Sequence, residues 1–135
     1  MMEKIDENVG KLVAALKETG EFENTLIFYF SDNGAASHVG DMMNSPYYGS
    51  KARMWEGGTK THCIVSWPKV IQPDTITDSV GWVGDILPTC LELAGTTYPE
   101  TFRGVKTSSP EGRSIVPVLK GQEIAPPEYL FSNDK

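Results

Sequence analysis

The stretch "TLIFYFSDNGA", from Thr25 to Ala35, decides the fold class of this chain. Residues 25–31 are apolar or β-branched at nearly every position, which is typical of a strand buried on both faces of a sheet. The run then ends abruptly at Asp32 and Asn33. Asp and Asn leave strands readily as turn residues, but they also carry the hard oxygens that a cation at the carboxyl edge of a sheet would need. On residue type alone, the turn is the commoner outcome of so short a motif.

The segments on either side of this strand predict an α/β protein. Apolar residues at helical spacing indicate an amphipathic helix over residues 3–19, and Gly20 follows it as a stop signal. "HCIVSW", residues 62–67, reads as a second strand that Pro68 ends. The order helix, short loop, buried strand is the rhythm of an α/β sandwich.

The remaining segments are shorter or irregular. Residues 32–60 form a long, glycine-bearing and aperiodic segment apart from a short turn near Ala52, and loops of that length tend to be functional or disordered. "DILPTCLELAG" predicts a short helix that begins near Asp85 and ends at Gly95. Three further predictions follow along the chain: a loop over 96–113, a brief turn or helix over 114–121, and the start of a strand at "EYLFS", residues 128–132.

Composition narrows the class of protein. The 135 residues suit one domain, and 39% hydrophobic with 22% charged residues is ordinary for a globular chain. A net charge of -6 argues against a nucleic-acid or anionic-membrane surface, and the absence of a long apolar run argues against a membrane span. Cys63 and Cys90 lie in apolar runs outside any metal-binding motif, so we expect small buried hydrophobes.

A second candidate motif is "GSKARMWEGG", Gly49 to Gly58. Lys51 can pair with an anionic group, and Gly57 and Gly58 permit a close backbone approach. The two histidines are more often structural than catalytic in such positions. His62 opens an apolar strand, which favours a hydrogen-bonded core histidine, and His38 is assigned no role.

Taken in order, the motifs resemble the sulfatase family over almost the whole chain. The matching segments are "VGKLVAALKETGEFENTLIFYFSDNGA", "NSPYYGSKARMWEGG", "IVSWPKVI", "VGDILPTCLELAG" and "EGRSIVPVLKG". The resemblance implies a partial alkaline-phosphatase-like α/β sandwich, with a mixed sheet and flanking helices. It places residues 1–135 in the C-terminal part of a sulfatase catalytic domain, with the C-terminal subdomain starting at about residue 113.

The resemblance also implies roles for particular residues. Asp32 and Asn33 match the second pair of ligands to a single divalent cation, usually Ca²⁺, with Mg²⁺ as the alternative. Lys51 matches the catalytic lysine that binds the sulfate ester. Glu56, with the two glycines after it, matches a motif that shapes the loop behind that lysine.

The chain also departs from the family pattern. The family nucleophile is a formylglycine made within Cys/Ser-x-Pro-x-Arg, and no segment here completes that motif. Where the motif requires arginine, the segment that begins at Ser66 has Val70, and the segment that begins at Ser108 has Gly112. The first pair of metal-binding aspartates and the active-site histidines of the family are missing too, and His62 stands where proline is common. We therefore expect a fragment of a sulfuric ester hydrolase, inactive alone, whose formylglycine lies outside this chain.

The expected partner is a small-molecule or glycan sulfate ester, and we expect the isolated chain to self-associate. Two alternatives remain open at this stage. One is a phosphomonoester or phosphodiester hydrolase of the same superfamily, which the Asp32-Asn33 pair disfavours because two-zinc phosphatases use histidine ligands. The other is a non-catalytic domain that kept the fold. Family members are commonly exported or lysosomal, but this sequence alone assigns no compartment.

Overall fold

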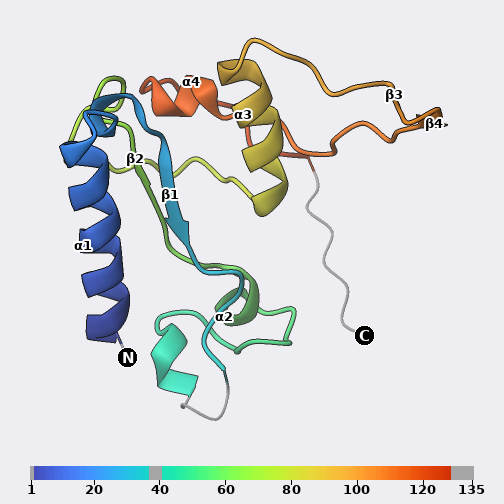
Figure 1. Cartoon of the computed structure of the whole chain (residues 1–135). Helices are drawn as coiled ribbons and strands as arrows, with labels where there is room; N and C mark the ends of the chain where they lie inside the picture. The colour runs from blue at the N-terminus through green and yellow to red at the C-terminus, as the bar shows by residue number, and fades with distance from the viewer. Residues whose placement is uncertain (1, 37–40, 129–135) are drawn as a thin grey trace. The chain divides into compact units, whose positions relative to one another are not determined.

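The computed structural model describes residues 2–36 and 41–128. These residues form two compact units, one comprising the described residues up to Lys69 and the other Val70–Glu128. Figure 1 labels the helices and strands of both units along the chain.

The first element is helix α1, Met2–Glu18, which confirms the predicted helix. Gly20 ends it with a left-handed backbone, φ 76°. The Gly20 N–H donates to Lys17 O at 3.2 Å, and the Glu21 N–H donates to Leu16 O at 2.9 Å. This pair of bonds is a Schellman motif, which glycine favours because a left-handed residue without a Cβ costs little.

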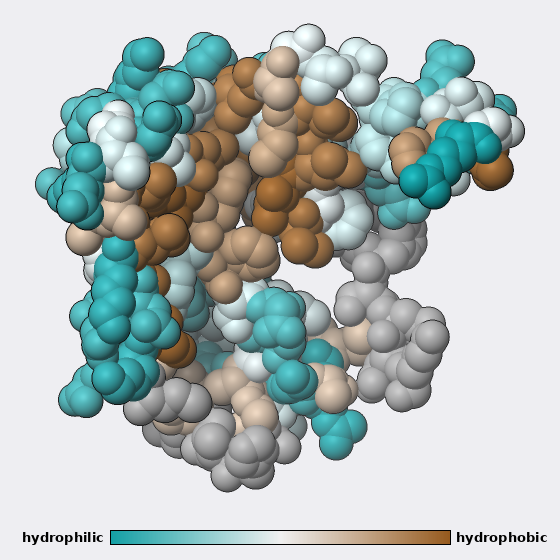
Figure 2. Space-filling view, viewed as in Figure 1, coloured by the Kyte–Doolittle hydropathy of each residue, from teal (hydrophilic) through white to brown (hydrophobic). Residues whose placement is uncertain are grey.

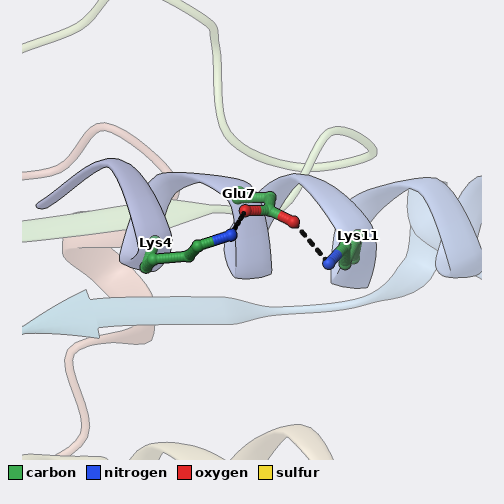
Figure 3. Close-up of polar contacts among 3 residues, drawn as sticks. All are labelled: Lys4, Glu7 and Lys11. Carbon is green, nitrogen blue, oxygen red and sulfur yellow. Dashed lines mark hydrogen bonds and ion pairs between the residues drawn. The ribbon is translucent and has the colours of Figure 1, made fainter. Parts of the chain in front are cut away.

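The exposed face of α1 carries a three-residue charge network (Figure 3). The Glu7 carboxylate accepts hydrogen bonds from Lys11 Nζ at 2.6 Å and from Lys4 Nζ at 2.5 Å. These two lysines, Lys11 foremost, hold the pKa of Glu7 below its usual range. Such exposed pairs at helical spacing contribute little stability, so the network marks the solvent face of α1, which is hydrophilic in Figure 2.

A short 3₁₀ turn, η1 (Phe22–Asn24), leads into strand β1 (Ile27–Phe30), which pairs with strand β2 (Cys63–Ser66). The pairing is antiparallel, with Ile27 opposite Ser66 and Phe30 opposite Cys63. Both predicted strands are therefore confirmed. Helix α1 runs alongside this two-stranded ribbon, with hydrophobic side chains between them in the space-filling view (Figures 1 and 2).

The predicted burial of β1 on both faces is wrong for the residues described. Phe30 is 38% exposed and Ile64, on β2, is 60% exposed. Among the described residues β1 and β2 form a two-stranded ribbon on their own. The faces of so small a sheet are not fully covered by other elements, and some of its apolar side chains stay exposed. Cys63 and Cys90 are both exposed, which corrects the expectation that they are buried. Partial burial still raises the pKa of the Cys63 thiol.

The long segment after β1 contains two short helical turns. These are η3 (Asp41–Asn44) and α2 (Glu56–Thr59). The turn expected near Ala52 is present. The sequence did not predict α2, because Gly57 and Gly58 are the poorest helix formers after proline. Both glycines are buried, so close packing rather than propensity holds this single turn.

The second unit is built on helix α3 (Ile86–Leu93), preceded by the 3₁₀ turn η4 (Val83–Asp85). Gly95 ends α3 with φ 63°, as the sequence predicted. The brief turn or helix predicted over 114–121 forms as α4, Val116–Leu119. Val116 and Leu119 are 3% and 6% exposed, and they are the buried hydrophobic residues of the described chain.

The loop predicted over 96–113 contains a small hairpin instead. Strand β3 (Thr101–Phe102) pairs antiparallel with strand β4 (Val105–Lys106). The two residues of the turn, Arg103 and Gly104, have φ of 51° and 79°. Two-residue hairpin turns with positive φ at both positions match the twist of the strands, but arginine at the first is not a usual signal for one.

Buried polar side chains tie α3 to the segment before α4. Asp85 is 2% exposed, and its carboxylate accepts the N–H of Trp82 at 3.1 Å and the N–H of Arg113 at 2.9 Å. Thr89 is 0% exposed; its hydroxyl donates to Asp85 O at 2.6 Å and accepts the Ile115 N–H at 3.0 Å. Every one of these bonds satisfies a polar group that water does not reach.

Thr89→Val is expected to destabilise the second unit by about 1–3 kcal/mol, because it leaves the Ile115 N–H without its acceptor at nearly constant side-chain volume. The matched control is Thr101→Val on exposed β3, where a change of about 0.5 kcal/mol or less is expected. Urea unfolding followed by NMR signals of α3 measures both. Equal effects at the two positions would contradict the role assigned to the Thr89 hydroxyl.

Within residues 2–36 and 41–128, no helix is both long and apolar enough to cross a membrane. The strand expected at 128–132 lies, beyond Glu128, outside the described residues.

Candidate functional site

Asp32 and Asn33 follow β1 directly, at the end of the strand. Asp32 is exposed and Asn33 is half-buried. The Ser31 hydroxyl donates to Asn33 O at 2.8 Å, and the Thr61 hydroxyl donates to Ser31 O at 3.0 Å. The chain therefore turns here, as the simpler interpretation expected, and the turn leaves the Asp32 carboxylate open to solvent.

Closely approaching glycines hold the chain after Asn33 against α2, as Figure 1 shows for the two segments. The Gly34 N–H donates to Gly58 O at 3.0 Å. A Cβ on Gly34 would lie 1.8 Å from Gly57 O, and one on Gly57 would lie 2.3 Å from Gly49 O. Real Cβ atoms do not approach oxygen so closely, so these positions require glycine. The predicted close approach at Gly57 and Gly58 is confirmed.

Lys51 lies on the same loop as Gly49, which closely approaches Gly57. Its N–H donates to Ala35 O at 2.9 Å, which brings the backbone of Lys51 next to the chain leaving β1. The Lys51 side chain is exposed, and it makes no ion pair with any residue that the structure describes. Ala52 follows with φ 67°, a left-handed conformation that costs a non-glycine residue about 1–2 kcal/mol.

The other nearby lysine is engaged differently. Lys60 Nζ lies 2.6 Å from a Glu56 carboxylate oxygen and 4.8 Å from the centre of the Tyr47 ring. The hydrogen bond that Lys60 donates to the Glu56 carboxylate raises the pKa of Lys60. Glu56 is thus paired with Lys60. Lys51 has no ion-pair partner among the described residues, so its ammonium group is available to bind an anion.

Asn44 is a residue that sequence reasoning missed. Its side-chain amide contacts both segments of the site: Oδ1 accepts the Ala35 N–H at 2.8 Å, and Nδ2 donates to Ala35 O at 3.3 Å and to Gly49 O at 2.9 Å. One asparagine in an aperiodic loop gives no sequence signal, because asparagine is a common loop residue.

Of the two histidines, His62 is among the described residues and packs against the ribbon. His62 is exposed, and its ring stacks on Tyr29 with centroids 5.9 Å apart. The expectation of a core histidine is therefore wrong, because β2 has an open face at this end of the ribbon. His38 lies outside the described residues.

Asp32 and Asn33 offer a carboxylate and an amide oxygen as candidate ligands for a cation. A carboxylate and an amide oxygen in sequence are chemically suited to Ca²⁺ or Mg²⁺. Across residues 2–36 and 41–128, however, no three His, Cys, Asp or Glu side chains gather into a metal-binding group. The donors present fit a hard cation in kind, and they would fill only part of the six to eight oxygen positions that calcium takes.

Comparison with known proteins identifies the family. The sulfatase family profile matches residues 1–96, and the chain belongs to the sulfatase family. Steryl-sulfatase of Homo sapiens is 36% identical over 96% of this chain and 23% of its own length. Steryl-sulfatase of Mus musculus is 34% identical over 96% and 21%. N-acetylgalactosamine-6-sulfatase of Mus musculus is 32% identical over 95% and 24%.

A solved structure confirms the predicted fold class. The structure of BT4656 in complex with its substrate, D-glucosamine-2-N,6-O-disulfate, superposes with a TM-score of 0.70 and 29% identity. The match covers 93% of this chain and 23% of that one. The chain therefore has a partial alkaline-phosphatase-like α/β fold, and it spans between about a fifth and a quarter of the length of these relatives.

Proposed function

We propose that this chain supplies part of the active site of a sulfuric ester hydrolase. Asp32 and Asn33 bind a divalent cation, Ca²⁺ with Mg²⁺ as the alternative, and Lys51 binds the sulfate group and assists its cleavage. The observation that carries the proposal is the hydrogen bond from the Lys51 N–H to Ala35 O, which joins the loop bearing the lysine to the strand end bearing Asp32 and Asn33. A cation site and an ammonium group in one neighbourhood suit a sulfate ester, which carries one negative charge, and the doubly charged sulfate that its hydrolysis releases.

The chemistry assigned to each residue follows from its charge. Asp32 and Asn33 would hold a divalent cation through their side-chain oxygens, at the carboxyl end of β1, where ligands of open α/β sheets are usually found. A cation held there would supply a Lewis acid that polarises the sulfate and stabilises charge developing on it. Lys51 offsets the charge of a sulfate oxygen. Its loop is already fixed by backbone hydrogen bonds, and such a preorganised donor stabilises a transition state without reorganising.

The nucleophile must come from elsewhere, because the sequence contains no Cys/Ser-x-Pro-x-Arg segment. We propose that residues 1–135 act as the C-terminal part of a sulfatase catalytic domain, with a C-terminal subdomain from about residue 113. Two experiments test this. Sequencing the gene upstream of the Met1 codon is expected to reveal Cys/Ser-x-Pro-x-Arg in frame. The purified chain is expected to hydrolyse no 4-nitrophenyl sulfate above a buffer control, and turnover by it would overturn the proposal.

The proposed substrate class is a small-molecule or glycan sulfate ester. The similarities on which this rests are to enzymes whose names specify a steryl sulfate or N-acetylgalactosamine-6-sulfate, and to BT4656 with its sulfated glucosamine substrate. These relatives share a sulfate ester and differ in what carries it. We propose that Asp32, Asn33 and Lys51 act on the sulfate group, which these substrates have in common.

Calcium is expected to bind the isolated chain with a Kd of about 1 mM or weaker, because the two side chains provide few of the oxygens that calcium takes and a single carboxylate. Isothermal titration calorimetry with CaCl₂ measures the affinity, with Asp32→Ala as the control. A micromolar Kd that disappears in Asp32→Ala would mean that the chain holds a complete site, contrary to the proposed partial one.

We also propose that the isolated chain self-associates through the β1–β2 ribbon. Exposed apolar strands with open edges promote pairing between copies. Sedimentation velocity is expected to show a weight-average coefficient that rises with concentration. Ile64→Lys, at a side chain 60% exposed on β2, is expected to reduce the rise, and Ile76→Lys, at a side chain 97% exposed outside any strand, is the matched control. A concentration-independent monomer would contradict this proposal.

A further inference from the structure

Asn44 joins the two segments that carry the proposed site residues. On one side, both its Oδ1 and its Nδ2 bind the backbone of Ala35, at 2.8 Å and 3.3 Å. On the other side, Nδ2 binds Gly49 O at 2.9 Å. Ala35 follows Asn33 by two residues, and Gly49 precedes Lys51 by two. The side chain thus links the segment that carries Asp32 and Asn33 to the segment that carries Lys51, two residues away from the nearest site residue on each side.

The bonds of Asn44 converge with those of the backbone at Ala35. Ala35 O accepts the Lys51 N–H at 2.9 Å as well as the Asn44 amide. A Cβ on neighbouring Gly34 would lie 3.2 Å from Asn44 Oδ1, so the amide also lies against the glycine contact. Asn44 is half-buried. A backbone group that loses its hydrogen-bond partner at such a position is not fully hydrated, so its loss of the bond costs free energy.

We propose that Asn44 is a positioning residue of the sulfate-ester site: it fixes the spacing between the Asp32-Asn33 pair and Lys51. This inference rests on the proposed function, because it assigns the two segments their roles. Only an amide can fill the position. The site needs one acceptor, for the Ala35 N–H, and donors, for two carbonyl oxygens, and asparagine supplies both kinds from one planar group.

Two substitutions separate the acceptor from the donors. Asn44→Ala removes all the bonds. Asn44→Asp keeps an acceptor of the same shape for the Ala35 N–H but places a carboxylate against the carbonyl oxygens of Ala35 and Gly49. Met43→Ala is the matched control, because Met43 belongs to the same turn, η3, and its side chain is 66% exposed.

Amide hydrogen exchange on the full chain tests the geometry without a metal. In Asn44→Ala, the Ala35 amide loses its acceptor and is expected to exchange about tenfold faster, the factor for losing one hydrogen bond of about 1.4 kcal/mol. The Lys51 amide, whose bond to Ala35 O depends on the spacing of the two segments, is expected to exchange faster as well. The Gly57 amide, which donates to Tyr48 O at 2.8 Å, is expected to stay protected and so reports that the loop is still folded. In Asn44→Asp, the Ala35 amide stays slow and the Lys51 amide becomes fast. Unchanged exchange at Lys51 in both variants overturns the proposal.

Paramagnetic broadening by Mn²⁺ then tests the spacing itself and separates this inference from the proposed function. In the wild-type chain, Mn²⁺ is expected to broaden the amides of Asp32, Asn33 and Gly34 together with that of Lys51. In Asn44→Ala and Asn44→Asp, the broadening at Lys51 is expected to be lost while that at Asp32 persists, and Met43→Ala should match the wild type. Broadening at Lys51 that survives both substitutions overturns the positioning role alone. No broadening at Asp32 in the wild type overturns the metal assignment, and the positioning role with it.

Discussion

Replacing Lys51 with alanine in the complete enzyme that carries this segment is expected to lower kcat/KM for a sulfate ester by about 100-fold or more. This is the scale for removing one preorganised group that stabilises charge in the transition state. The side chain is exposed, so the folded structure and the metal content are expected to survive the substitution. Steady-state kinetics with 4-nitrophenyl sulfate, alongside metal analysis of the same samples, measures both effects.

The matched control for this substitution is Lys69→Ala. Lys69 is also an exposed lysine of the first unit, but it follows β2, and its backbone N–H donates to Glu23 O at 3.1 Å. A surface substitution of that kind is expected to leave kcat/KM within about threefold, because it removes no group that meets the substrate. Equal rates for Lys51→Ala and Lys69→Ala would mean that Lys51 is an ordinary solvated residue of its loop.

Gly34→Ala is expected to have the largest effect on stability, about 3 kcal/mol or more. Its Cβ would lie 1.8 Å from Gly57 O and 2.8 Å from Gly57 C, and both are backbone atoms that cannot rotate away. Relief would require the chain after β1 to separate from α2, which breaks the bond from the Gly34 N–H to Gly58 O. Urea unfolding followed by NMR signals of β1 and β2 gives the free energy of unfolding.

Gly10→Ala provides the opposite expectation for the same chemical change. Gly10 lies within α1, and an added Cβ would meet nothing within 4 Å. Alanine is the better helix former by about 1 kcal/mol, so this variant is expected to be more stable than the wild type. A neutral Gly34→Ala would show that the two loops do not approach as described, whatever the result for Gly10→Ala.

The elements with strong local signals were predictable from the sequence. Helix α1 followed from helical periodicity and from Gly20, whose left-handed backbone ends it. Strands β1 and β2 followed from their β-branched and aromatic composition, and Gly95 marked the end of α3. In each case the residues near one another in sequence carry the physical cause, so the pattern is readable without the fold.

The features that depend on distant contacts were not predictable. Helix α2 contains two glycines and forms because those glycines are buried against the backbone of Tyr48, Gly49, Ser50 and Arg53, which no local propensity encodes. Cys63 and His62 are exposed because other elements do not cover them at that end of β2. The apolar pattern of a strand does not indicate whether another element will cover it. The hairpin at 101–106 turns through Arg103 in a conformation that its residue type does not favour.

The candidate site divides in the same way. Asp32, Asn33 and Lys51 were identified from motifs whose order resembles the sulfatase family, and their roles stay proposals. The bond between Lys51 and Ala35, and the three bonds of Asn44, were invisible in the sequence because they join segments that are aperiodic. The sequence therefore indicated which groups could carry the chemistry, and the structure added the contacts that hold their segments together.

If Asp32 and Asn33 act together with Lys51 on a sulfate group, an NMR titration of the 135-residue chain will detect it. Sodium sulfate is added with and without CaCl₂ at matched ionic strength, while the side-chain signals of Lys51 and Lys69 are followed. We expect sulfate to shift the Lys51 signals when calcium is present, a smaller shift without calcium or in Asp32→Ala, and no response at Lys69. Shifts of equal size at both lysines, independent of calcium and of Asp32→Ala, would show that the three residues do not act together.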